Sequence, residues 1–178
     1  MFSGKTEKLI SILENFTVLE NYIHKAPLAI VFKPIIDMRY NAHSIASHSG
    51  KTFPANPLPQ EGEGSLWEHV NVSDVGPSFV AFDEIQFFGP WIVGEVQDLV
   101  RRGANVVASG LDLTFKGEPF GPMPQLLCLA DEVVKLTARC SKCGGSANRS
   151  QRTVESVADV LVGGAEAYEP RCGTCFRP

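Results

Sequence analysis

SFVAFDEIQFF, at residues 78–88, is the stretch that decides the predicted fold of this 178-residue chain. Residues 78–82 are almost entirely apolar, which predicts a short buried strand. The strand runs straight into Asp83 and Glu84. In an open α/β sheet, ligands bind where the strands end, so an acidic residue here fits a Mg²⁺ ligand and its neighbour fits a proton acceptor. A solvated acidic turn is the alternative interpretation of the pair taken alone.

The segments on both sides of this stretch alternate between strand and helix patterns. Together they predict a parallel α/β sheet. Gly103 is placed as the residue that ends a helix. The region 37–66, rich in Ser, His, Gly, Pro and Asn, is predicted to be a mobile loop that is most flexible at 61–64. Further strands are expected at 27–33, 104–109 and 132–138, and helices at 5–24, 90–102 and 122–131.

Composition describes an ordinary globular protein, with 44% hydrophobic and 20% charged residues. The net charge of −4 argues against a protein that binds nucleic acid mainly through its phosphates. The sequence shows no signal peptide and no apolar run of membrane-spanning length. It therefore predicts a cytoplasmic protein that binds neither nucleic acid nor membrane.

The N-terminal sequence MFSGKT contains a phosphate-binding pattern in Ser3-Gly4-Lys5-Thr6, directly before a predicted helix. Backbone N–H groups at such a helix start bind anions, a Lys reaches the phosphates of ATP and a Thr hydroxyl binds Mg²⁺. The leading Gly of the full pattern is not present. Taken alone, the pattern is explained better as the chance start of a helix than as a phosphate-binding loop.

Two Cys-x-x-Cys pairs, Cys140/Cys143 and Cys172/Cys175, supply four thiolates for a tetrahedral Zn²⁺. Because protein fills all four positions, the predicted zinc is structural rather than catalytic. The fifth cysteine, Cys128, falls in an apolar predicted helix and is expected to be a core residue.

Two other segments carry candidate residues. Asp37 and Arg39 lie beyond the strand predicted at 27–33, where they fit metal and phosphate contacts or a surface ion pair. Phe115 and Phe120 lie in the Gly- and Pro-rich segment LDLTFKGEPFGPMP, at residues 111–124. Aromatic side chains on such a loop are able to flank a flat base, although aromatic residues more often form core.

Taken together, several stretches resemble the thymidine kinase family of the type found in bacteria, animal cytosol and poxviruses. The resemblance covers most of residues 1–6 and 32–178. The matching stretches are MFSGKT, FKPIIDMRY (32–40), SHSG (47–50), FDEIQFF (82–88), the whole of 109–144, SQR (150–152) and VGGAEAY (162–168).

The resemblance implies transfer of the γ-phosphoryl group of ATP to the 5′-hydroxyl of thymidine or deoxyuridine, with Mg²⁺, in a homotetramer. It implies a RecA-like core over residues 1–139 and a zinc-anchored lobe with a substrate lasso over residues 140–178. Glu84 is then the general base. The residues placed around ATP and Mg²⁺ are Met1, Phe2, Ser3, Gly4, Lys5, Thr6, Asp37, Arg39, Asp83, Gln86 and Arg152. Those placed around the nucleoside are Phe87, Leu111, Phe115, Phe120, Ser150, Asp159, Val160, Leu161, Val162, Gly163 and Tyr168.

The chain departs from this pattern at its start, since family members carry a strand and Gly-Pro before Met-Phe-Ser-Gly-Lys. This departure favours, as the alternative function, a non-catalytic zinc-stabilised protein that binds the nucleoside but not ATP. A zinc-ribbon module for nucleic acid is disfavoured by the negative net charge.

Overall fold

Four parallel strands form the centre of the fold, in the order β4-β1-β5-β6. They are β1 (Ala29–Pro34), β4 (Asn56–Leu58), β5 (Phe79–Phe82) and β6 (Asn105–Ala108). The structure is a computed structural model that describes residues 2–23, 29–37, 42–62, 65–70, 79–155 and 161–178. Every pair in this sheet is parallel, with Val31 opposite Ala81 and Ala81 opposite Val107. The predicted α/β fold is confirmed, as are the three predicted strands over their described residues.

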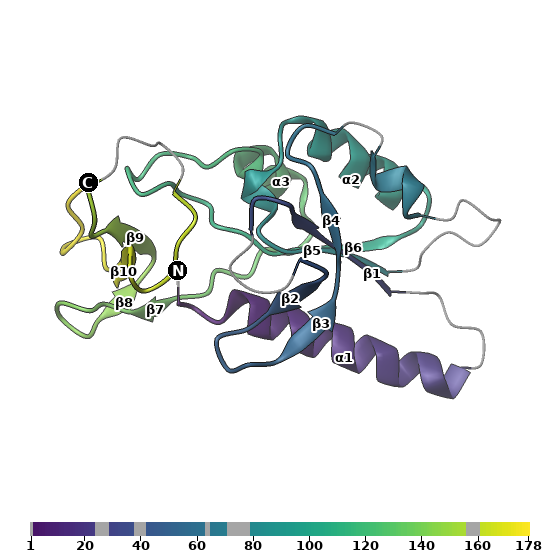
Figure 1. Cartoon of the computed structure of the whole chain (residues 1–178), viewed down its shortest axis with the longest axis horizontal. Coiled ribbons are helices and arrows are strands. Elements are labelled where there is room, and N and C mark those ends of the chain that lie inside the picture. Colours follow the sequence, from purple (N-terminus) through teal and green to yellow (C-terminus); the bar gives the residue numbers. More distant parts are fainter. Residues whose placement is uncertain (1, 24–28, 38–41, 63–64, 71–78, 156–160) are drawn as a thin grey trace.

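Helices cover both faces of the sheet (Figure 1). On one face lies α1 (Lys5–Ile23), whose Leu9, Ile10 and Leu13 pack beneath the strands. The opposite face is covered by α2 (Trp91–Arg101) and α3 (Met123–Leu129). Every side chain of β5 is buried because the strand lies between two neighbours and two helical layers.

The predicted helices are confirmed with small changes in their ends. Gly103 ends α2 as predicted, with φ +87° and an N–H that donates to the carbonyl of Val100 at 2.9 Å. Cys128, however, is exposed on α3, so its assignment to the core is wrong. The buried side of this short helix is formed by Met123 and Leu126, and Cys128 lies off that side.

Residues 37–66 contain regular structure, so the prediction of a loop alone is wrong. The hairpin of β2 (Ser44–Ala46) and β3 (Thr52–Pro54) is followed by β4, and η1, a 3-10 helix, begins at Ser65 and ends at Glu68. Ile45 and Leu58 are buried and anchor these short strands to the core. Phe53 and Ala55 pack in the same cluster as Ile45, so a few apolar positions hold these strands, although they are too few for a recognisable periodicity. Residues 63–64 lie outside the described part of the chain.

The strand predicted at 132–138 is also wrong. Only Ala138–Arg139 pair, as β7, antiparallel to β8 (Ser146–Ala147). Val133 and Val134 are 43% and 55% exposed. Apolar residues favour a strand only where a neighbouring strand accepts their backbone hydrogen bonds, and residues 132–137 join none of the described sheets.

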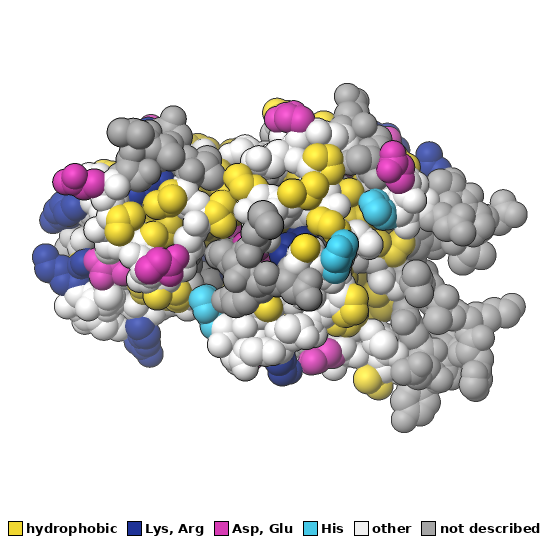
Figure 2. All heavy atoms as spheres, viewed as in Figure 1, with side chains coloured by type: hydrophobic (Ala, Val, Ile, Leu, Met, Phe, Trp, Pro, Cys, Tyr) yellow, Lys and Arg dark blue, Asp and Glu magenta, His cyan; other side chains and the backbone are white. Residues whose placement is uncertain are grey.

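Beyond β7, the chain forms a small lobe at one end of the molecule, made of β7, β8, β9 (Arg149–Arg152) and β10 (Tyr168–Arg171). On the face drawn in Figure 2, its basic side chains are mixed with acidic ones. The division into units 1–139 and 140–178 remains a prediction. In the described residues, no helix has both the length and the apolar character needed to cross a membrane.

Candidate functional site

Asp83 and Glu84 form a buried acidic turn at the end of β5. They are only 4% and 7% exposed. The Asp83 N–H donates to the carbonyl of Phe32, and the Ile85 N–H donates to that of Ser109. These bonds attach the turn to both neighbouring strands, and between them Glu84 adopts φ +49°. A left-handed backbone is unfavourable for a non-Gly residue and is typical of functional sites.

The N-terminus of α1 lies against this turn. The Thr6 hydroxyl donates to Asp83 at 3.0 Å from Oδ2, and the Lys5 ammonium lies 3.9 Å from Oε1 of Glu84. Gly4 has φ +76°, and its carbonyl accepts the first helical hydrogen bond, from Lys8. The structure therefore brings the two motifs together, 77 residues apart in sequence between Thr6 and Asp83.

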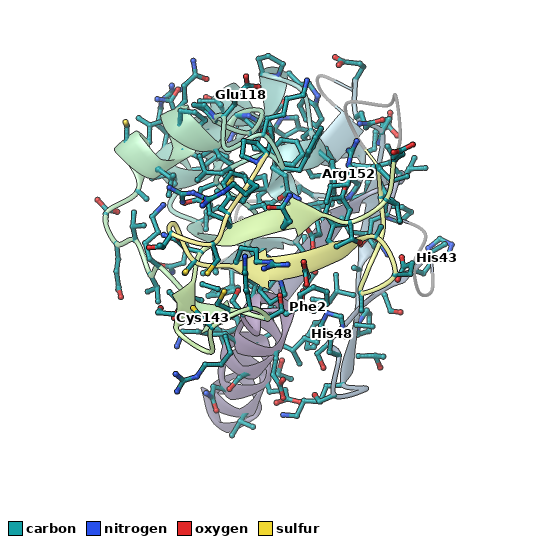
Figure 3. All side chains as sticks on the ribbon, turned by 90° about the vertical axis from the view of Figure 1, so that its left-hand side faces the viewer. Phe2, His43, His48, Glu118, Cys143 and Arg152 are labelled. Carbon is teal, nitrogen blue, oxygen red and sulfur yellow. The ribbon has the colours of Figure 1, made fainter. Side chains whose placement is uncertain are left out.

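Phe2 lies beside the β2–β3 hairpin. Its ring centroid is 5.4 Å from that of His48 (Figure 3). In the same region, Ser49 donates to Glu7 of α1 at 2.9 Å. The hairpin thus supports the segment that leads into α1, a role that the loop prediction for 37–66 did not include.

Burial raises the pKa of Asp83 to about 6, and the charge of Glu84 adds to this rise. Lys5 and the Thr6 hydroxyl oppose it. Two adjacent buried carboxylates concentrate negative charge at the end of β5. Carboxylate and hydroxyl oxygens are ligands that suit Mg²⁺, so a divalent cation fits this donor set.

The raised pKa of Asp83 predicts a pH-dependent stability. Asp83 in the unfolded chain titrates near 3.8, so between about pH 4 and 6 the folded protein binds more protons than the unfolded one. Relative to the protein with ionised Asp83, the contribution of Asp83 to the free energy of unfolding is fully present below about pH 4. It is lost as pH rises through about 6. It amounts to about 3 kcal/mol, since one pKa unit corresponds to about 1.4 kcal/mol.

Asp83→Asn should remove this dependence. In urea unfolding without Mg²⁺, the variant should gain stability relative to the unmodified chain as pH rises from 4.5 to 7. Asp131→Asn, at an exposed residue, serves as the matched control and should show a constant difference. A constant difference for Asp83→Asn would contradict the assignment.

The loop between β6 and α3 packs against the acidic turn. The ring of Phe120 meets that of Phe87 edge-to-face, with centroids 5.5 Å apart. The backbone N–H of Leu111 donates to the side chain of Gln86 at 3.0 Å. Two glycines of this loop that were not among the predicted site residues, Gly110 and Gly121, allow this close packing. A Cβ at Gly121 would lie 2.4 Å from the carbonyl oxygen of Gln86.

Gly121→Ala should therefore destabilise the chain by roughly 3 kcal/mol, from overpacking added to an unfavourable backbone conformation. Gly50→Ala is the matched control, because Gly50 also has positive φ but no atom within 4 Å of its Cβ position. That variant should lose only about 1 kcal/mol. Equal losses in urea unfolding would show that the contact with Gln86 has no energetic weight.

Side chains of the C-terminal lobe reach the same loop. The Arg152 guanidinium carbon lies 3.6 Å from the ring centroid of Phe115. The guanidinium donates to the Tyr168 hydroxyl at 3.2 Å, and that hydroxyl donates to the carbonyl of Leu161 at 2.7 Å. This chain of contacts links the loop to the predicted lasso.

The remaining predicted residues are placed as follows. Asp37 and Ser150 are buried, at 6% and 7% exposure, and Ser150 lies on β9. Val162 and Gly163 precede β10 in the described part of the lobe. Outside the described residues lie Met1, Arg39, Asp159 and Val160.

The four paired cysteines form one cluster in the lobe. Their sulfur atoms all lie within 4.8 Å of one another, and those of Cys143 and Cys172 are 3.7 Å apart. A tetrahedral Zn²⁺ with bonds of about 2.3 Å holds its sulfurs about 3.8 Å apart, so the geometry fits zinc. The cluster is therefore able to hold the predicted metal.

The thiols of this cluster differ in acidity. Backbone N–H groups, that of Cys172 first, hold the pKa of Cys140 at about 6. Those of Cys175 and Thr174 contribute to a lowered pKa at Cys172. The neighbouring thiols, Cys172 first, raise the pKa of Cys175 to about 12. Without a cation, the cluster therefore resists holding four negative charges, and a divalent metal would relieve this repulsion.

A lysine and threonine at a helix N-terminus, facing a buried acidic pair at a strand end, form the arrangement typical of α/β proteins that bind phosphate groups. The four-cysteine cluster narrows this class to proteins that also carry a site able to hold a metal ion. The family model described as "Thymidine kinase" matches residues 1–176 of the 178. The chain therefore belongs to the thymidine kinase family, as the sequence resemblance indicated.

Proposed function

We propose that this chain transfers the γ-phosphoryl group of ATP to the 5′-hydroxyl of thymidine or deoxyuridine, giving the nucleoside monophosphate and ADP. The observation that carries the proposal is the contact between the start of α1 and the acidic turn. Thr6 bonds to Asp83, while Lys5 lies 3.9 Å from Glu84. The family match supports the same reaction.

In this proposal the triphosphate binds at the N-terminus of α1, where free backbone N–H groups and the Lys5 ammonium attract its charge. Glu84 accepts the proton of the 5′-hydroxyl as the oxygen forms its bond to the γ-phosphorus. The bond from that phosphorus to the bridging oxygen breaks, and ADP leaves with the electron pair. Phosphoryl transfer depends mainly on such positioning and charge neutralisation.

Metal ions have separate roles here. Thr6 and Asp83 would hold Mg²⁺, which neutralises charge on the transferred phosphoryl group. Zinc, held by the four cysteines, would keep β9 and β10 in place.

The nucleoside would contact residues of both parts of the chain. In the core these are Phe87, Leu111, Phe115 and Phe120, and in the lobe they are the lasso, Ser150 and Tyr168. Asp37 and Arg152 would act near the phosphates, and the assembly is proposed to be a homotetramer.

The test is ADP release by the purified, zinc-loaded chain with Mg²⁺ and ATP, followed for thymidine, deoxyuridine, deoxycytidine and deoxyadenosine. Release should depend on thymidine or deoxyuridine, and mass spectrometry should identify the 5′-monophosphate. A folded chain that releases no ADP with any nucleoside would overturn the proposal. Calorimetry would then decide for the nucleoside-binding alternative if thymidine binds and ATP does not.

A further inference from the structure

Gln86 is a buried polar side chain whose two hydrogen-bonding ends meet different parts of the site. It lies in η2 (Ile85–Phe87), directly after the acidic turn, and is 2% exposed. A buried amide is stable only when its donor and acceptor both find partners. The partners of Gln86 therefore define its orientation.

The orientation of the amide follows from the chemistry of those partners. The backbone N–H of Leu111 can only donate, so the atom 3.0 Å from it must be the carbonyl oxygen Oε1. The NH₂ end therefore faces Glu84 and donates to Oε2 at 2.6 Å. Glu84 keeps its other oxygen, Oε1, on the side of Lys5.

Both ends of the loop between β6 and α3 close on Gln86. At the start, a Cβ at Gly110 would lie 2.7 Å from its Oε1 atom. At the far end, a Cβ at Gly121 would lie 2.4 Å from its backbone carbonyl oxygen. The segment between them carries Phe115 and Phe120. Gln86 is thus held between the acidic turn and the loop.

We propose that Gln86 is a positioning residue that orients the Glu84 carboxylate and couples it to the loop carrying Phe115 and Phe120. The donor end fixes Oε2 of Glu84, so that Oε1 lies on the side of Lys5, and the acceptor end holds the start of the loop. The inference rests on the proposed phosphoryl transfer. It assigns Gln86 a contact with the proposed general base, Glu84, in place of the contact with ATP expected from the resemblance.

Two variants separate the two hydrogen bonds. Gln86→Glu keeps an acceptor for Leu111 but places a second carboxyl group against the Glu84 carboxylate, so the two hold one shared proton in place of the amide donor. The basicity of Glu84 is then disturbed, so kcat should fall at least 10-fold while the KM for thymidine stays within about 3-fold. Gln86→Met, of similar length, loses both bonds, so kcat should fall and KM should rise. Gln125→Met, at an exposed position of α3, is the matched control and should change neither.

A double-mutant cycle then tests whether Gln86 acts through Glu84. In a Glu84→Gln background, Gln86→Met should lower the residual rate by less than about 3-fold, because the residue it orients is already disabled. A full multiplicative loss would overturn the inference, as would a folded Gln86→Met chain with unchanged kcat and KM. If the unmodified chain itself releases no ADP, the proposed function fails and this inference fails with it. An active unmodified chain makes the Gln86 result decisive alone.

Discussion

Glu84→Gln is expected to lower kcat by roughly 10³-fold while the chain stays folded, since general bases contribute about 10²–10⁴-fold. Glutamine has the size of glutamate, and its carbonyl oxygen is able to accept the hydrogen bond from Gln86. What it lacks is the capacity to take a proton. It also removes one of the two charges from a turn where the pKa of Asp83 is already raised by Glu84. The variant should therefore unfold at a urea concentration no lower than that of the unmodified chain.

The measurement is steady-state ADP release together with calorimetric titration of thymidine and ATP. Both ligands should still bind, which separates a lost proton transfer from a lost site. Glu132→Gln, at an exposed residue, is the matched control and should retain full activity. If folded Glu84→Gln kept its turnover, the proton acceptor would have to be another group.

Cys172→Ser should abolish stable zinc binding and unfold the C-terminal lobe. Structural zinc contributes apparent binding free energies of about 10–16 kcal/mol in small domains, comparable to the whole stability of a typical domain. Cys172 has a lowered pKa, so it should be among the first thiolates to engage a metal. The lobe also carries Arg152 and Tyr168, so its unfolding should remove their contacts with Phe115 and Leu161. Activity should fall by at least 100-fold, the scale of losing several positioning contacts at once.

Zinc content per chain, measured by mass spectrometry of the metal, is the direct readout. Cys128→Ser is a close control, because Cys128 is an exposed thiol outside the cluster. That variant should keep one zinc per chain and full activity. Retention of one tightly bound zinc by Cys172→Ser would contradict the four-thiolate site.

Continuous burial makes a strand easy to predict from sequence, although β6, whose two end residues are exposed, was predicted as well. In β5, Phe79–Phe82 is buried on both faces, so its apolar run was a sufficient signal. Residues 132–138 were also predicted to form a strand, and yet only Ala138 of these residues pairs, as part of β7, because side-chain hydrophobicity says nothing about a neighbouring strand. The short strands β2 and β3 were missed because they do have a neighbouring strand but carry few apolar residues. Their hairpin depends on a turn at Gly50 and on few buried positions.

The candidate site also has a part that could be predicted from sequence and a part that could not. The motifs predicted that Lys5, Thr6, Asp83 and Glu84 would act together, because their side-chain chemistry is characteristic. The contacts of Gln86 with the loop were less accessible, since the backbone N–H of Leu111 and the glycines that meet Gln86 are brought there by packing. Likewise, the stacking of Arg152 on Phe115 joins residues 37 positions apart. No local pattern in the sequence encodes that contact.

The segment at 130–137 joins α3 to the lobe as an exposed, extended stretch of chain, and this has a consequence for proteases. A protease cleaves backbone that is accessible and extended. Trypsin cleaves after lysine, and the side chain of Lys135 in this segment is 60% exposed. Brief digestion should therefore cut after Lys135 before it cuts after Lys5, whose side chain is only 18% exposed. After such a cut, only noncovalent contacts such as that of Arg152 with Phe115 would hold the two products together. Whether they separate on a sizing column would test the predicted boundary near residue 139.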